Sequence, residues 1–162
     1  MSRACFPAGL TTLLLLVLAA PLGLPGQPQL QTACVLASVY FWSLFRPAAM
    51  PAPMVFLLGL LSDLLGQAPP GIAVLTLLIV QGLALRWRRE LARQGFVLVW
   101  MAFLAVAAGA ALLEWGLTSV LSWRLFPIGP AIFEFLLAGG LYPGFATLLT
   151  RAHRSVAAPE QA

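Results

Sequence analysis

The chain has 162 residues, of which 61% are hydrophobic and only 9% are charged, and its mean hydropathy is +0.96. A soluble domain carries about 25% charged residues, so a water-soluble fold could not hide this much apolar surface. The net charge is +4 and every basic residue is arginine, but the arginines stand at the ends of apolar runs rather than along a basic face, which argues against nucleic acid as a partner.

Six apolar runs follow one another along the chain, and a membrane-spanning helix needs about 20 such residues. The runs cover residues 6–24, 30–45, 54–65, 72–85, 96–121 and 131–149. Proline and glycine mark the short connections, as in tight turns between antiparallel helices. The sequence therefore predicts an all-α, polytopic membrane bundle of about six transmembrane helices. It forms one domain over residues 1–154, and a short disordered cytoplasmic tail follows at 155–162.

The first run has a second interpretation as a secretory signal peptide. Arg3 would be its basic start and residues 10–20 its apolar core. Pro21 directly after Ala19 and Ala20 is a poor context for cleavage, and the apolar run continues beyond it. We favour a retained first helix and leave cleavage open, because the remaining topology is the same in both cases.

The third run is the shortest, and the arginines decide whether it crosses. Its 12 residues rise only about 18 Å, short of the roughly 30 Å hydrocarbon core. If all six runs cross from a cytoplasmic N-terminus, Arg124 alone lies outside and eight arginines lie inside. If the third run turned back, the cluster at 86–93 would move outside, against the positive-inside rule.

We therefore predict six crossings with both termini in the cytoplasm. The cytoplasmic arginines act as topology anchors at an anionic leaflet, although the cluster at 86–93 could also contact a cytoplasmic partner. Besides Arg3, these anchors are Arg46, Arg86, Arg88, Arg89, Arg93, Arg151 and Arg154.

Three carboxylates stand within the apolar runs, where ionisable groups are expensive and suggest a function. In the six-span topology Asp63, Glu114 and Glu134 all lie toward the outer side. The only arginine on that side is Arg124, in the loop between the last two helices. We predict an outer-face charge cluster in which one or more carboxylates pair with Arg124. The equally weighted alternative is that each carboxylate reaches interfacial water.

Asp63 lies on a glycine-rich helical face. Gly59, Asp63 and Gly66 are spaced i, i+4 and i+7, and Gly71 follows in a proline-rich turn. Small residues on such a face allow another backbone to approach closely. Asp63 could accept N–H bonds from this turn or from the start of the next helix. We favour this structural role over catalysis, because a lone carboxylate lacks the constellation that chemistry needs.

No motif in the chain indicates an enzyme, a cofactor or a metal. The single histidine, His153, stands in the arginine-rich C-terminal segment. The chain has one aspartate in total, so the aspartate spacing that holds Mg²⁺ in membrane phosphotransferases is missing. We expect no catalytic activity, no cofactor and no metal site.

One segment resembles a known family. It runs from Tyr40-Phe-Trp-Ser-Leu-Phe-Arg-Pro47, through the proline-punctuated residues 50–53, to Gly59-Leu-Leu-Ser-Asp63-Leu-Leu-Gly66 and Pro70-Gly71. This pattern is similar to the core of the rod shape-determining protein MreD family. Trp100, Phe103 and Leu141-Tyr142-Pro143 resemble the last two helices of that family. The chain departs from the pattern at Pro69-Pro70, where a single proline or a leucine is expected.

The resemblance implies a bacterial inner-membrane subunit of the cell-elongation machinery without catalytic activity. Members of the family associate with MreC, a single-span protein. Through it they connect to the MreB filament and to the RodA and penicillin-binding peptidoglycan synthases. The resemblance also implies a fold similar to the substrate-binding membrane subunits of vitamin transporters.

A small bundle of this kind acts within the membrane plane, so its partners must supply spanning helices or surfaces next to the membrane. Small residues such as Ala105 and Gly109 could form a seam for a partner helix, although internal packing is the favoured interpretation. The alternative function is a small transporter or a substrate-binding transporter subunit. That function requires a polar cavity near the midplane, whereas the middle of these runs consists mainly of Leu, Ala and Val.

Overall fold

The computed structural model of the protein describes residues 6–20, 25–66, 69–91 and 93–157. Within these ranges the chain forms six α-helices, one short 3-10 helix and no strand, so the predicted all-α class is confirmed. Each apolar run contributes one helix. The elements are α1 (Phe6–Ala19), α2 (Gln27–Phe45), η1 (Pro47–Ala49), α3 (Ala52–Leu65), α4 (Ile72–Leu91), α5 (Phe96–Leu121) and α6 (Gly129–Ala157).

The helix ends follow local chemistry. Pro53 lies in the first turn of α3, where its missing N–H has no intrahelical partner to lose. Helix α4 continues past its apolar run into the arginine cluster, which puts Arg88 and Arg89 in its last turn. Helix α6 continues to Ala157, so residues 155–157 of the predicted disordered tail are helical. The rest of that tail lies outside the described residues.

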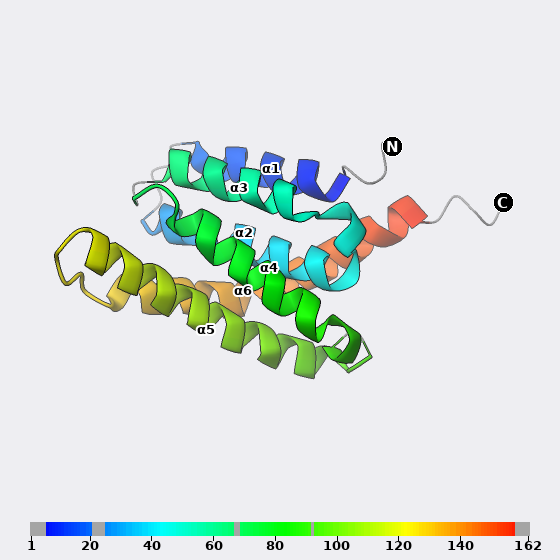
Figure 1. The fold of residues 1–162 in the computed structure, drawn as a ribbon. Coiled ribbons are helices and arrows are strands. Elements are labelled where there is room, and N and C mark those ends of the chain that lie inside the picture. Colours follow the sequence, from blue (N-terminus) through cyan, green and yellow to red (C-terminus); the bar gives the residue numbers. More distant parts are fainter. Residues whose placement is uncertain (1–5, 21–24, 67–68, 92, 158–162) are drawn as a thin grey trace.

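The helices run back and forth between two ends of an elongated bundle (Figure 1). Helices α1 and α3 lie on one side, α5 and α6 lie on the other, and α2 and α4 pass between them. Helix α2 packs against α1, α4 and α6, while α3 packs on α4 and α5 on α6. The start of α1 and the end of α6 lie at the same end of the bundle as the α4–α5 connection.

Helix α2 is the central element of the core. All residues from Ala33 to Leu44 are buried, including the polar Ser38 and Ser43. The outer faces are apolar instead: Val97 of α5 is 68% exposed and Val120 is 70% exposed. Large exposed apolar surfaces mark contact with lipid or with other proteins. The exterior of the bundle is therefore suited to an apolar environment.

An aromatic cluster joins α2 to the last two helices. The rings of Phe103 and Tyr142 stack with their centroids 4.2 Å apart, and Tyr40 packs against both. Trp100 of α5 donates its indole N–H to the carbonyl of Gly139 at 3.1 Å. These contacts combine ring packing with a satisfied polar group, and they fix the spacing of α2, α5 and α6.

Two of the described helical segments are long and apolar enough to cross a membrane, namely Phe96–Leu121 and Gly129–Leu148. Shorter apolar stretches occur at Gly9–Leu18 and Ala52–Leu65. The two long segments give weak support for a membrane location. Helix α2 is less apolar because its polar side chains face the protein interior, where they do not meet lipid.

The arginines of the described chain separate toward the two ends of the bundle. Arg46 ends α2, and Arg86, Arg88, Arg89 and Arg93 lie at the end of α4 and in the connection to α5. Because α2 and α4 run in the same direction, these residues share one end, whereas Arg124 follows α5 at the other end. Arg3 lies outside the described residues, and so do the side chains of Arg151 and Arg154.

Candidate functional site

The Asp63 carboxylate joins the end of α3 to the start of α4. Its Oδ2 accepts the N–H of Gly71 at 2.8 Å and that of Val74 at 3.3 Å, and its Oδ1 accepts the N–H of Ala73 at 3.0 Å. The first N–H groups of a helix have no intrahelical partner, and a carboxylate there also suits the helix dipole. The buried Asp63 thus makes the backbone contacts expected of a brace.

The glycines of the same motif each have a distinct geometric role. A Cβ on Gly59 would lie 2.6 Å from Cα and 3.0 Å from N of Val74, so α3 and α4 approach closely only because residue 59 is glycine. Gly66 ends α3 and donates its N–H to the carbonyl of Ser62 at 2.8 Å. Gly71 has a φ of 101°, which favours glycine. The motif specifies a helical hairpin, here called the α3–α4 hairpin (52–91).

A second buried polar contact supports this hairpin and was not predicted from the sequence. Gln81 of α4 donates its amide N–H to the carbonyl of Met50 at 2.7 Å, and both residues are buried. Met50 follows the short helix η1, so the bond ties α4 to the connection between α2 and α3. The available signal was a glutamine within an apolar run, because a buried amide needs a partner.

The three carboxylates predicted to share one end of the bundle come together in the fold. The Glu114 carboxylate of α5 lies within electrostatic range of Glu134 in α6 and of Asp63 in α3. The Thr76 hydroxyl of α4 is directed toward Glu114. Glu114 and Glu134 are each partly exposed. We call these two residues the glutamate pair.

The predicted pairing with Arg124 does not form in this structure. Among the described residues, no ion pair joins Arg124 to any of the three carboxylates. Arg124 is exposed in the loop after α5, beside the 94% exposed Trp123. That loop is positioned by a different contact, in which Trp115 donates its indole N–H to the carbonyl of Phe126 at 3.0 Å. The charge cluster therefore consists of acidic residues.

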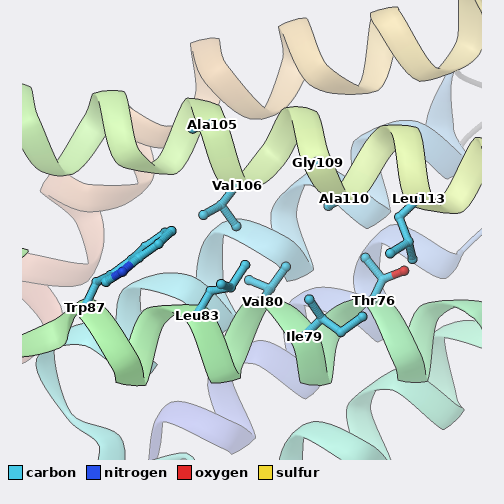
Figure 2. Close-up of a pocket in the computed structure, with 10 residues that line it drawn as sticks. All are labelled: Thr76, Ile79, Val80, Leu83, Trp87, Ala105, Val106, Gly109, Ala110 and Leu113. Atoms are coloured by element: carbon cyan, nitrogen blue, oxygen red, sulfur yellow. The ribbon is translucent and has the colours of Figure 1, made fainter.

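An apolar groove of about 260 Å³ opens between α4 and α5 (Figure 2). Its α4 wall presents aliphatic side chains between Thr76 at one end and Trp87 at the other. Its α5 wall is low because much of it consists of alanine and glycine. The lining residues are Thr76, Ile79, Val80, Leu83, Trp87, Ala105, Val106, Gly109, Ala110 and Leu113.

The small residues of α5 leave this groove open. Ala105 and Gly109 are both exposed, and no atom lies within 4 Å of a Cβ built on Gly109. The favoured interpretation, that these two residues serve internal packing, is therefore wrong. Sequence reasoning found the seam on α5 but not the opposite wall on α4, because nothing in the sequence pairs these two helix faces.

The geometry favours binding over catalysis. The groove presents one hydroxyl and one indole ring among aliphatic groups, and predominantly apolar lining of this kind binds other apolar surfaces. The polar part of Asp63 is occupied by backbone N–H groups. In the described part of the chain, no group of three or more His, Cys, Asp or Glu side chains has the arrangement of a metal site.

Comparison with known proteins identified no matching protein-family model, no matching curated protein and no matching solved structure.

Proposed function

We propose that this chain is a non-enzymatic scaffold subunit of the bacterial cell-elongation complex, similar to the MreD family. It supports peptidoglycan synthesis and cell shape by binding an MreC-like single-span partner in the inner membrane. Through that partner it contacts the MreB filament, RodA and the penicillin-binding synthases indirectly. The observation that carries the proposal is the open apolar groove between α4 and α5, because such a groove suits a helix that supplies apolar side chains.

The proposal includes six crossings of the inner membrane with both termini in the cytoplasm. The bundle exposes large apolar side chains on its outer faces and buries polar ones in its central helix, as expected where lipid is the solvent. The described arginines of α2 and α4 share one end of the bundle, which fits the positive-inside rule. The 14 residues of α3 rise about 21 Å, and local thinning of the bilayer accommodates a short helix.

The segment that carries the family resemblance supports the proposal through its structural roles. Tyr40 and Trp42 are buried in the core, and Met50 accepts the bond from Gln81. Gly59 and Asp63 hold α3 against α4. These residues specify the fold and leave no reactive group free. Such a motif fits a scaffold family, and the expected likeness to vitamin-transporter subunits belongs to the same proposal.

The groove offers a site for the spanning helix of the partner. A helix is about 10 Å wide, so it would lie along the groove and insert side chains over Ala105 and Gly109. Close approach at small residues is a common basis of helix association in membranes. The apolar lining also argues against the alternative function of a transporter, whose substrate site needs polar groups near the midplane.

Co-purification of the tagged full chain from its native membrane tests the proposal. We expect wild type to recover the MreC-like protein together with the peptidoglycan synthases. The variant Gly109→Leu fills the groove and should lose them. Gly82→Leu is the matched control, because Gly82 is also exposed on a helix with open space around it but does not line the groove.

Recovery of an ATPase module instead of the synthases would overturn the proposal in favour of a transporter subunit. Equal recovery of the partner by the two variants would also overturn the assignment of the groove as its binding site.

A further inference from the structure

The groove between α4 and α5 ends beside the glutamate pair, Glu114 and Glu134. Leu113 is the last α5 residue in the groove lining and directly precedes Glu114. The two glutamates interact electrostatically with each other, and Glu114 also interacts electrostatically with Asp63. Neither glutamate has a cationic partner among the described residues. The groove therefore ends beside a pair of carboxyl groups.

Thr76 marks the junction of these two parts. It lines the groove and is only 1% exposed. Its hydroxyl is placed to donate to the Glu114 carboxylate. Figure 2 shows the hydroxyl oxygen beside the Leu113 side chain. A threonine hydroxyl that donates to Glu114 still leaves most of the acceptor capacity of the two carboxylates unused.

A cation with N–H donors would suit the glutamate pair. Two like charges close together disfavour each other, and a carboxylate near a bilayer is costly unless paired. An ammonium or guanidinium group donates several N–H bonds and carries the opposite charge. It would satisfy the glutamate pair and leave the apolar part of the groove for hydrocarbon.

We propose that the groove receives an apolar spanning helix that carries a lysine or arginine near its outer end, where it pairs with Glu114 and Glu134. This inference rests on the proposed function and adds the chemistry by which the partner is recognised. The apolar part of the helix lies over Ala105 and Gly109, and its other end lies beside Trp87. Charge complementarity fixes both the register and the direction of the partner.

A second copy of this chain does not fit the groove equally well. The arginines in helices lie near the end of α4 and near the end of α6, at the end of the bundle opposite to the glutamate pair. Arg124 is on the required side, but it lies in a loop outside any helix. A partner helix with its own basic residue at the outer end matches the site, whereas a helix of this chain does not.

The test uses the purified full chain reconstituted in phosphatidylcholine vesicles with synthetic spanning peptides. Each peptide has about 22 Leu and Ala residues, enough to cross the bilayer, and carries either Lys or Gln near its outer end. Association is measured by fluorescence transfer between dyes on the chain and on the peptide. We expect the Lys peptide to bind at least roughly tenfold more tightly than the Gln peptide, as for a close charge pair.

The variants separate charge from shape. The double change Glu114→Gln and Glu134→Gln should abolish the preference for Lys while leaving binding of the Gln peptide unchanged. Gly109→Leu should weaken binding of both peptides, whereas Gly82→Leu should weaken neither. Each variant is first checked for a wild-type elution volume and melting temperature.

Three results would overturn the inference. Equal binding of the two peptides would remove the charge-pairing role. Loss of the Lys preference after adding phosphatidylethanolamine would assign the site to a lipid amine. Self-association of the chain that Gly109→Leu abolishes would assign the groove to a second copy. The peptides require no cellular partner, so failure of co-purification alone would overturn only the proposed function.

Discussion

The α3–α4 hairpin and the α5–α6 hairpin (96–157) solve the same packing problem in different ways. In the first, Asp63 accepts three backbone N–H groups and Gly59 brings the two helices into close contact. In the second, aromatic stacking and one indole bond hold the helices, while Glu114 and Glu134 have no backbone partner among the described residues. One hairpin uses its carboxylate within the fold, whereas Glu114 of the other directly follows Leu113 at the end of a groove.

An acidic residue in an apolar helix can therefore have one of two roles, a structural role or a binding role. A carboxylate that is saturated by backbone donors stabilises local structure and has little capacity left for a ligand. A carboxylate without backbone donors keeps more acceptor capacity for a partner. The partners of the carboxylate, rather than its presence, therefore indicate whether a site is structural or functional.

The largest expected effect is on the α3–α4 hairpin. Asp63→Ala removes the acceptor of three N–H bonds and should lower the free energy of unfolding by about 3 kcal/mol, at about 1 kcal/mol for each donor left unpaired. Thermal unfolding in mild detergent should show a large decrease in melting temperature. Asp63→Asn keeps one acceptor oxygen and should lie between Asp63→Ala and wild type.

The matched change in the other hairpin is Glu114→Ala. If Asp63→Ala and Glu114→Ala lowered the melting temperature equally, the distinction between the two kinds of carboxylate would be wrong.

The next effect concerns the close contact at Gly59. In Gly59→Ala the new Cβ meets the backbone of Val74 at 2.6 Å, and backbone atoms cannot turn aside as a side chain can. We expect a loss of about 2 kcal/mol, typical of overpacking. Gly109→Ala is the control in the other hairpin. Its Cβ meets open space, so the better helix propensity of alanine should stabilise it by about 0.5–1 kcal/mol.

A loss of stability in both glycine variants would show that α5 is more closely packed than the structure indicates. Melting temperatures measured in the same detergent decide between these outcomes.

A smaller effect is expected at Gln81. Gln81→Leu leaves the buried carbonyl of Met50 without its donor and replaces the amide by an apolar group of similar size. We expect a destabilisation of about 1 kcal/mol, the usual value for one unpaired buried group. Gln81→Glu should be worse than Gln81→Leu, because it places a second acceptor against the same carbonyl. The reverse order in melting temperature would contradict this account.

The two hairpins also differ in how far the sequence predicted them. The role of Asp63 was predictable because its donors lie only 8 to 11 residues away in the chain, so spacing and turn chemistry define it. The gathering of the three carboxylates followed from the alternating direction of the helices.

The groove was not predictable in the same way. It requires the relative rotation of α4 and α5, which depends on contacts such as the stack of Phe103 on Tyr142. The pairing with Arg124 was wrong because the sequence fixes the side of the loop but not the position of the side chain within it. Residues distant in the chain can share one end of a bundle without being in contact.

The smallest expected effect on stability is that of Glu134→Gln. Glu134→Gln removes one of two interacting carboxylates without changing side-chain shape, and Glu134 has no backbone donor to lose among the described residues. We expect the melting temperature to stay equal to that of wild type or to rise slightly, because repulsion between like charges is relieved. A clear decrease would mean that Glu134 has a structural partner in the folded chain. An unchanged melting temperature would mean that the glutamate pair does not stabilise the fold, as expected if its role is to bind a cationic helix in the adjacent groove.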